Sequence, residues 1–98
     1  MYNTSGIFSI TNKLTNKQYI GQSTNIYALW KKYKYNYHTG NSEIFSDMRE
    51  YGIENFEFKV IEKCPIHLLN DKEKYYIALY NTLSPSGYNK TKGHTYTI

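Results

Sequence analysis

Residues 6–23 read GIFSITNKLTNKQYIGQS, two short aromatic- and glycine-containing stretches joined by a polar segment. In the first stretch, the apolar residues Ile7, Phe8 and Ile10 follow a spacing typical of a strand. Tyr19 and Ile20 lie in the second stretch, and the NKLTN segment between the two is rich in turn-forming residues. The pattern predicts a β-hairpin with strands over 6–11 and 17–22.

The segment after the hairpin predicts a helix. Its apolar positions are spaced by four, three and four residues, which places them on one face: Ile26, Trp30, Tyr33 and Tyr37. The polar residues 23–25 offer side-chain oxygens that can cap the first free backbone N–H groups. We expect Gly40 to end this helix.

Two further helices flank a third strand. Residues 42–51 predict a helix that ends at Gly52, and NFEFKVI (residues 55–61) alternates as a half-buried strand does. After Pro65, a third helix is expected to be lined by its apolar residues: Leu68, Leu69, Tyr75, Tyr76, Leu79 and Tyr80. The order ββααβα predicts an α+β fold, a small three-stranded antiparallel sheet flanked by helices. We expect a single domain over residues 1–90 and a short C-terminal tail over 91–98.

Charge is unevenly distributed along the 98 residues, whose net charge is +4. Residues 1–40 contain five lysines and no carboxylate, whereas all eight carboxylates lie between Glu43 and Glu73. A regional excess of positive charge favours binding to phosphate groups. The alternative is a lysine-rich surface that only aids solubility.

The sequence predicts a cytoplasmic protein. It has no run of eighteen apolar residues, and its first residues, MYNTSG, lack the basic and apolar segments of a signal peptide. The single Cys64 has no partner for an internal disulfide, which favours a reducing compartment.

The stretch KKYKYNYH (residues 31–38) interleaves lysines with tyrosines. Lysines can contact phosphates and tyrosines can stack on bases, so this segment is a candidate nucleic-acid surface. Tyr33 and Tyr37 share the apolar face, which leaves Lys31, Lys34 and Tyr35 as the better candidates. Lys32 belongs to the same basic run, and Lys90 and Lys92 can join it if the C-terminus folds back. The alternative is a solvated lysine face over an aromatic core.

In sequence order, the chain contains GIF, YIG, a helix with Trp and Lys, REYGIENFEFKVIE, a Glu in a later helix, and GYN. Together these landmarks, over roughly residues 5–90, resemble the GIY-YIG nuclease superfamily. The resemblance implies a metal-dependent endonuclease with tyrosines on the hairpin strands and a histidine on the first helix. It also implies a helix arginine that binds the scissile phosphate and a later glutamate that holds one divalent metal ion, Mg²⁺.

The resemblance assigns Tyr19, Gly21, Glu73 and Asn89 to positions that keep the family pattern, with Glu73 as the candidate metal ligand. Four positions depart from it: Phe8 lacks the tyrosine hydroxyl, Leu29 replaces the arginine, Tyr33 replaces the histidine, and Asn41 occupies a further polar or histidine position, with His38 three residues away. Each retained residue also has a structural explanation. Tyr19 can pack on the sheet, Glu73 can form a surface ion pair, and Asn89 can satisfy a turn.

Losing a cation that clamps the phosphoryl group commonly costs about two to three orders of magnitude in rate, and losing a general base costs about 10² more. We therefore expect a non-catalytic or strongly attenuated protein that binds nucleic acid or a nucleotide, without a cofactor. One alternative is an active Mg²⁺-dependent endonuclease in which Lys31, Lys32 or His38 replaces the missing groups. Another is a phage or mobile-element product that binds a nucleotide signal or a protein partner.

Overall fold

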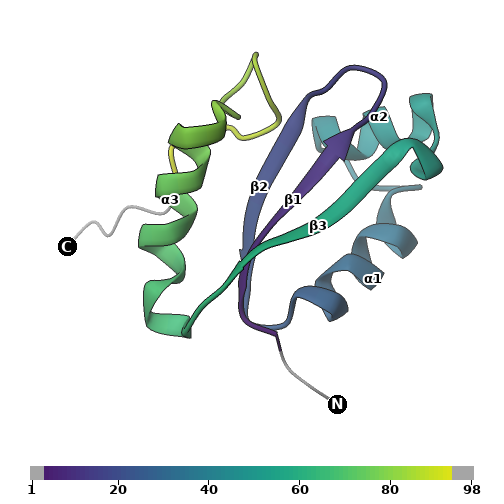
Figure 1. The fold of residues 1–98 in the computed structure, drawn as a ribbon. Helices are drawn as coiled ribbons and strands as arrows, with labels where there is room; N and C mark the ends of the chain where they lie inside the picture. Colours follow the sequence, from purple (N-terminus) through teal and green to yellow (C-terminus); the bar gives the residue numbers. More distant parts are fainter. Residues whose placement is uncertain (1–3, 94–98) are drawn as a thin grey trace.

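The computed structural model describes residues 4–93, so residues 94–98 of the predicted tail lie outside it. A three-stranded antiparallel sheet has the order β2-β1-β3 and is flanked by helices (Figure 1). The elements are β1 (Gly6–Asn12), β2 (Gln18–Ser23), α1 (Ile26–Asn36), α2 (Glu43–Tyr51), β3 (Phe56–Lys63) and α3 (Leu69–Tyr80), with short 3-10 turns η1 (Ile53–Asn55) and η2 (Ile66–Leu68). The predicted α+β fold and its ββααβα order are confirmed. None of the helices in residues 4–93 has the length and apolar character needed to cross a bilayer.

The central strand β1 pairs with β2 along one edge and with β3 along the other, and almost all of its residues are buried. Phe8 lies opposite Gly21 and Ile10 opposite Tyr19, so these four residues share one face of the sheet. Ser9 lies opposite Ile20 on the other face. The hairpin register therefore decides that Tyr19 points to the same side as Phe8.

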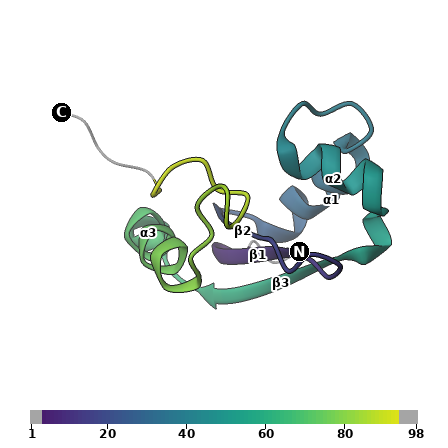
Figure 2. The same cartoon turned by 90° about the horizontal axis from the view of Figure 1, so that it is seen from above.

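Each face of the sheet packs against different helices. On one face, Phe8 and Ile10 pack in a core cluster with Ile26 of α1 and with Ile44 and Met48 of α2. On the other face, a second cluster joins Ile7 and Ile20 to Leu69 and Ile77 of α3. The helices thus separate into an α1–α2 side and an α3 side, with the strands between them (Figures 1 and 2).

The first helix ends at Asn36, four residues before Gly40, where the sequence predicted its end. Gly40 serves another purpose, because a Cβ atom there would overlap the ring of Phe45. Arg49 Nη1 donates to the carbonyl oxygens of Tyr37 (2.7 Å) and Gly40 (2.8 Å), which satisfies acceptors beyond the end of α1. This arginine therefore ties α1 to α2.

The expected inward face of the third helix was only partly correct: Leu69 and the half-buried Tyr76 pack in the second cluster, but other members of that face do not. Tyr75 and Leu79 are each 58% exposed, whereas the buried residues of α3 are Leu69, Glu73 and Ile77. These three follow an i, i+4, i+8 spacing that includes a carboxylate. A pattern of apolar residues alone therefore does not predict this buried face of α3.

Candidate active site

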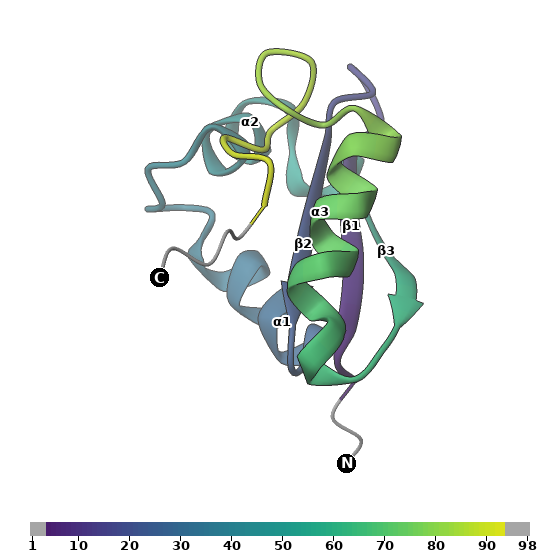
Figure 3. The same cartoon turned by 90° about the vertical axis from the view of Figure 1, so that its left-hand side faces the viewer.

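A cavity of about 330 Å³ lies at the β2 edge of the sheet, where the α1–α2 side and the α3 side both reach it. Its lining comes from four parts of the chain: Tyr19 of β2; Tyr33 of α1; Ser42, Glu43 and Ile44 at the start of α2; and Glu73 and Ile77 of α3. The segment after α3 completes it with Tyr88, Asn89, Lys90, Thr91 and Gly93. We call residues 82–93 the C-terminal strap, which runs between α3 and α2 (Figure 3).

Asn89 fixes the strap to the edge strand. Its Nδ2 donates to the carbonyl oxygen of Ile20 (2.9 Å), and its Oδ1 accepts from the backbone N–H of Ile20 (2.9 Å). The same Oδ1 accepts from Thr82 Oγ1 (2.7 Å), and Asn89 is only 6% exposed. The side-chain amide therefore pairs with β2 as another strand would, which supports the structural explanation of this residue.

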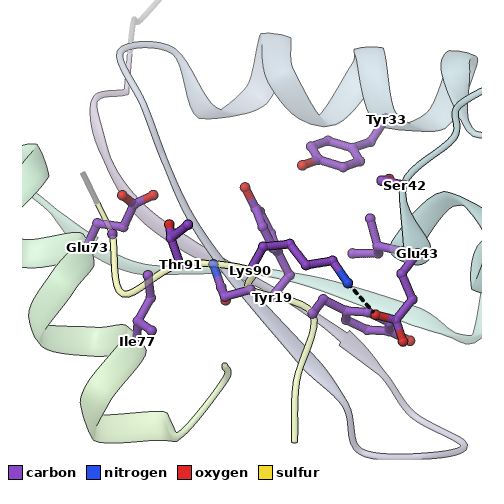
Figure 4. Close-up of a pocket in the computed structure, with 12 residues that line it drawn as sticks. Tyr19, Tyr33, Ser42, Glu43, Glu73, Ile77, Lys90 and Thr91 are labelled. Atoms are coloured by element: carbon purple, nitrogen blue, oxygen red, sulfur yellow. Dashed lines mark hydrogen bonds and ion pairs between the residues drawn. The ribbon is translucent and has the colours of Figure 1, made fainter. Parts of the chain in front are cut away.

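Tyr19 and Tyr33 both line the cavity, Tyr19 near its middle and Tyr33 beside Ser42, with ring centroids 6.4 Å apart (Figure 4). Burial raises the pKa of both phenols. For Tyr19, the hydrogen bond from Tyr33 opposes this rise in pKa, while the nearby Glu73 carboxylate adds to it. For Tyr33, the neighbouring Tyr19 adds to the rise. Both hydroxyls are therefore protonated at neutral pH.

Glu73 marks one end of the cavity. It is 7% exposed, and its Oε1 accepts from Gln22 Nε2 at 3.1 Å. Within residues 4–93 it forms no ion pair, and no three His, Cys, Asp or Glu side chains cluster as a metal cage. Mg²⁺ is often held by one or two carboxylates together with substrate phosphates and waters. A buried carboxylate with only a neutral donor fits that role.

Two lysines meet a second carboxylate at the other end of the cavity. Lys90 Nζ lies 3.1 Å from Glu43 Oε1, and Lys17 Nζ contacts Glu43 Oε2. The hydrogen bonds from Lys17 and then Lys90 lower the pKa of the Glu43 carboxyl. Lys17 also lies 4.9 Å from the ring centroid of Tyr88. The sequence pointed to Lys90 only as a possible part of a basic patch, and no local motif indicated Glu43 or Lys17.

Phe8 and Leu29, where the sequence departs from the family pattern, lie outside the cavity lining. Phe8 is fully buried, and Leu29 packs against the same core cluster. Gly21 leaves room for the Phe8 and Tyr19 rings, because a Cβ atom there would lie 2.5 Å from Phe8 Cζ and 2.8 Å from Tyr19 Cε2. Gly21 thus serves close packing of the aromatic rings.

The predicted basic and polar residues on and after α1 also lie outside the cavity lining. Lys31, Lys32, Tyr35 and Asn41 are exposed. Lys34 lies 5.4 Å from the ring centroid of Phe58, and the His38 ring lies 4.0 Å from that of Tyr37. Lys34 and His38 instead line a second hollow, together with Trp30 and Phe58. Of the thirteen predicted site residues, the first cavity brings together Tyr19, Tyr33, Glu73 and Asn89.

Comparison with known proteins shows the family and the fold of the chain. A sequence model of the GIY-YIG catalytic domain family matches residues 4–89 of this chain. The fold is similar to the catalytic domain of the intron endonuclease I-TevI, in a point-mutant form, with 25% identity, a TM-score of 0.82, and coverage of 93% of this chain and 97% of that one. A structure of the catalytic domain of the homing endonuclease I-TevI gives 27% identity, a TM-score of 0.78, and coverage of 89% and 98%. Because the family model spans most of the chain, this protein belongs to the GIY-YIG nuclease family.

Proposed function

We propose that this protein binds nucleic acid or a nucleotide in the Tyr19–Glu73 cavity, and that its phosphodiester hydrolysis is absent or strongly attenuated. The observation that carries the proposal is the composition of the cavity. Among the described residues it contains three tyrosines and two glutamates, but no histidine and no arginine, and its one lysine is paired with Glu43.

Hydrolysis of a phosphodiester needs a base that takes a proton from water and a cation that stabilises the phosphoryl oxygens. The raised pKa values of Tyr19 and Tyr33 keep their hydroxyls protonated at neutral pH, so neither is ready to act as a base. Leu29 packs in the core and offers no charge. The surviving groups therefore suit binding better than rapid bond cleavage.

Binding is supported by charge and by position. Lys90 lines the cavity near the start of α2, Lys17 contacts the same Glu43 carboxylate, and Lys31 and Lys32 are exposed on α1. Phosphate groups are attracted to such a distribution, whatever the base sequence.

A second candidate function is a slow, metal-dependent endonuclease. Tyr19 and Glu73 line the same cavity, and the Glu73 carboxylate forms no ion pair within residues 4–93. Mg²⁺ bound there would supply positive charge to the phosphoryl oxygens. Glu73 would hold the ion, and the Tyr19 hydroxyl would donate to an oxygen of the reacting group.

The test is incubation of the protein with plasmid and branched DNA in the presence of Mg²⁺ or Mn²⁺, beside a Glu73→Ala variant. Retained DNA binding that weakens steeply with salt, without cutting, supports the proposal. Metal-dependent cutting at the rates typical of GIY-YIG endonucleases, if it disappears in Glu73→Ala, would refute the proposed loss of catalysis. If neither cutting nor salt-sensitive binding is observed, nucleic-acid binding is refuted, and co-purification then tests for a protein partner.

A further inference from the structure

We propose that Lys17 and Lys90, together with the first turn of α2, form a phosphate-binding site that the Glu43 carboxylate occupies in the free protein. This inference rests on the proposed function, because it names the chemical group of the ligand that this end of the cavity binds. It also identifies the cations that take over phosphate binding in a chain whose first helix has Leu29.

The ion cluster is assembled from three separate parts of the chain. Lys17 lies in the hairpin loop just before β2, Glu43 begins α2, and Lys90 lies on the strap. Each carboxylate oxygen of Glu43 contacts a different lysine, Oε2 with Lys17 and Oε1 with Lys90. Two converging ammonium groups that hold two oxygens of one carboxylate can also hold two oxygens of a phosphate.

The start of α2 adds to the positive potential. Ser42 is the N-cap of this nine-residue helix, and its side chain accepts from the backbone N–H of Phe45. Ser42, Glu43 and Ile44 all line the cavity, so the N-terminal end of the helix faces it. A helix N-terminus favours negative charge, which Glu43 itself now provides.

The same geometry places the cluster beside the tyrosines. Lys90 extends across the cavity past Tyr19 toward Glu43, while Glu73 lies on the far side (Figure 4). A phosphate held by Lys17 and Lys90 therefore lies at the end of the cavity opposite Glu73, with Tyr19 between them. The Lys17 side chain keeps its position because it packs over the ring of Tyr88.

Displacement of Glu43 is energetically accessible. The side chains of Lys17, Glu43 and Lys90 are 25%, 33% and 63% exposed, so water and salt screen both ion pairs. A dianionic phosphate competes with a single carboxylate for the same lysines. Glu43 thus lowers the affinity of the site for phosphate without closing it.

The test is an NMR titration with pyrophosphate at constant ionic strength, in which amide shifts are followed across residues 42–44 and 90–91. We expect saturable shifts in the wild type and tighter binding, by roughly three- to tenfold, in Glu43→Gln, because the internal competitor is gone. In Lys90→Met we expect weaker binding by a factor of about five to ten. Dispersed spectra of each variant show that it is folded.

Matched variants separate local effects from net charge. Glu50→Gln removes the same charge from an exposed position of α2, and Lys63→Met removes a lysine at the end of β3. Neither residue lines the cavity, and neither variant is expected to change pyrophosphate affinity. Absence of saturable shifts in the wild type, or equal effects of Glu43→Gln and Glu50→Gln, would overturn the inference.

The same variants in a binding assay with labelled single-stranded DNA keep the two proposals apart. We expect Lys90→Met to lower the slope of log affinity against log salt by about 0.7, the value of one lost phosphate contact. If the wild type binds DNA but Lys90→Met and Glu43→Gln bind it equally well, the phosphate site is wrong and the proposed function stands. If pyrophosphate binds as expected but DNA does not, the site stands and the nucleic-acid function fails.

Discussion

Replacing Asn89 with alanine is expected to destabilise the protein by about 3 kcal/mol, because each lost buried hydrogen bond costs about 0.5–1.5 kcal/mol. The variant removes three such bonds, two with the backbone of Ile20 and one from Thr82 Oγ1. All of these groups lie on buried residues, so water does not replace Asn89 in the folded state. A loss of this size is a large part of the stability of a small domain, which is roughly 5–15 kcal/mol.

The assay is urea unfolding at 25 °C, with the midpoint and the m value both measured. Asn41→Ala is the matched control, because Asn41 is exposed, and we expect it to stay within about 0.5 kcal/mol of the wild type. Hydrogen exchange supplies a local reading. The amide of Ile20 donates to Asn89 Oδ1, so its exchange should accelerate in Asn89→Ala more than that of other β2 amides.

Asn89→Asp separates the amide donor from the acceptor. Aspartate keeps an oxygen for the N–H of Ile20, but it places a carboxylate against the buried Ile20 carbonyl. We expect this variant to be at least as unstable as Asn89→Ala at neutral pH. If Asn89→Ala unfolds within about 0.5 kcal/mol of the wild type, the strap is not held by this side chain and the reasoning fails.

Three further predictions concern packing and titration. Gly21→Ala should lower the free energy of unfolding by about 1–3 kcal/mol, because the added Cβ atom would lie 2.5 Å from Phe8 Cζ. Urea unfolding measures this change, and an unchanged midpoint would contradict the close packing at Gly21. The pKa of Glu43 is lower in the folded state, so its contribution to stability is present above the unfolded pKa and is lost as pH falls through the folded pKa. The difference in urea midpoint between the wild type and Glu43→Gln should therefore shrink below about pH 4. A difference that does not depend on pH would exclude the ion cluster as its cause. The hydrogen bond to Glu62 raises the pKa of Tyr76 to about 12, so this interaction stabilises the fold below about pH 10 and is lost as pH rises through the folded pKa. In ¹³C NMR, one tyrosine Cζ signal should titrate near pH 12, and it should disappear in Tyr76→Phe.

Local sequence patterns predicted the elements well where burial follows a simple period. The hairpin, α2 with Gly52 at its end, and the alternating third strand all appear within one or two residues of the expected bounds. The pattern misled for α3, because its buried stripe includes Glu73 and its exposed face carries Tyr75 and Leu79. Periodicity identifies a buried face only when that face is apolar.

The candidate site was only partly predictable, and the missing part is long-range. The family landmarks placed Tyr19, Tyr33 and Glu73 in one site, and these residues do share a cavity. Glu43 and Lys17 carry no local signal, because they are 26 residues apart and meet only through the packing of α2 on the hairpin. Charged residues at such separations look like ordinary surface residues in a sequence.

The sequence by itself determined the hairpin, the helices and the family, because these depend on short spacings of residue types that are read along the chain. Only the tertiary structure decided what each site residue contacts. The register of β1 against β2 turned Tyr19 toward α1, and Asn89 drew the strap across the edge of β2. That path carries Lys90 to Glu43 and so determines the charge of the cavity. Contacts between distant segments depend on how the faces of the elements pack, which no local pattern contains.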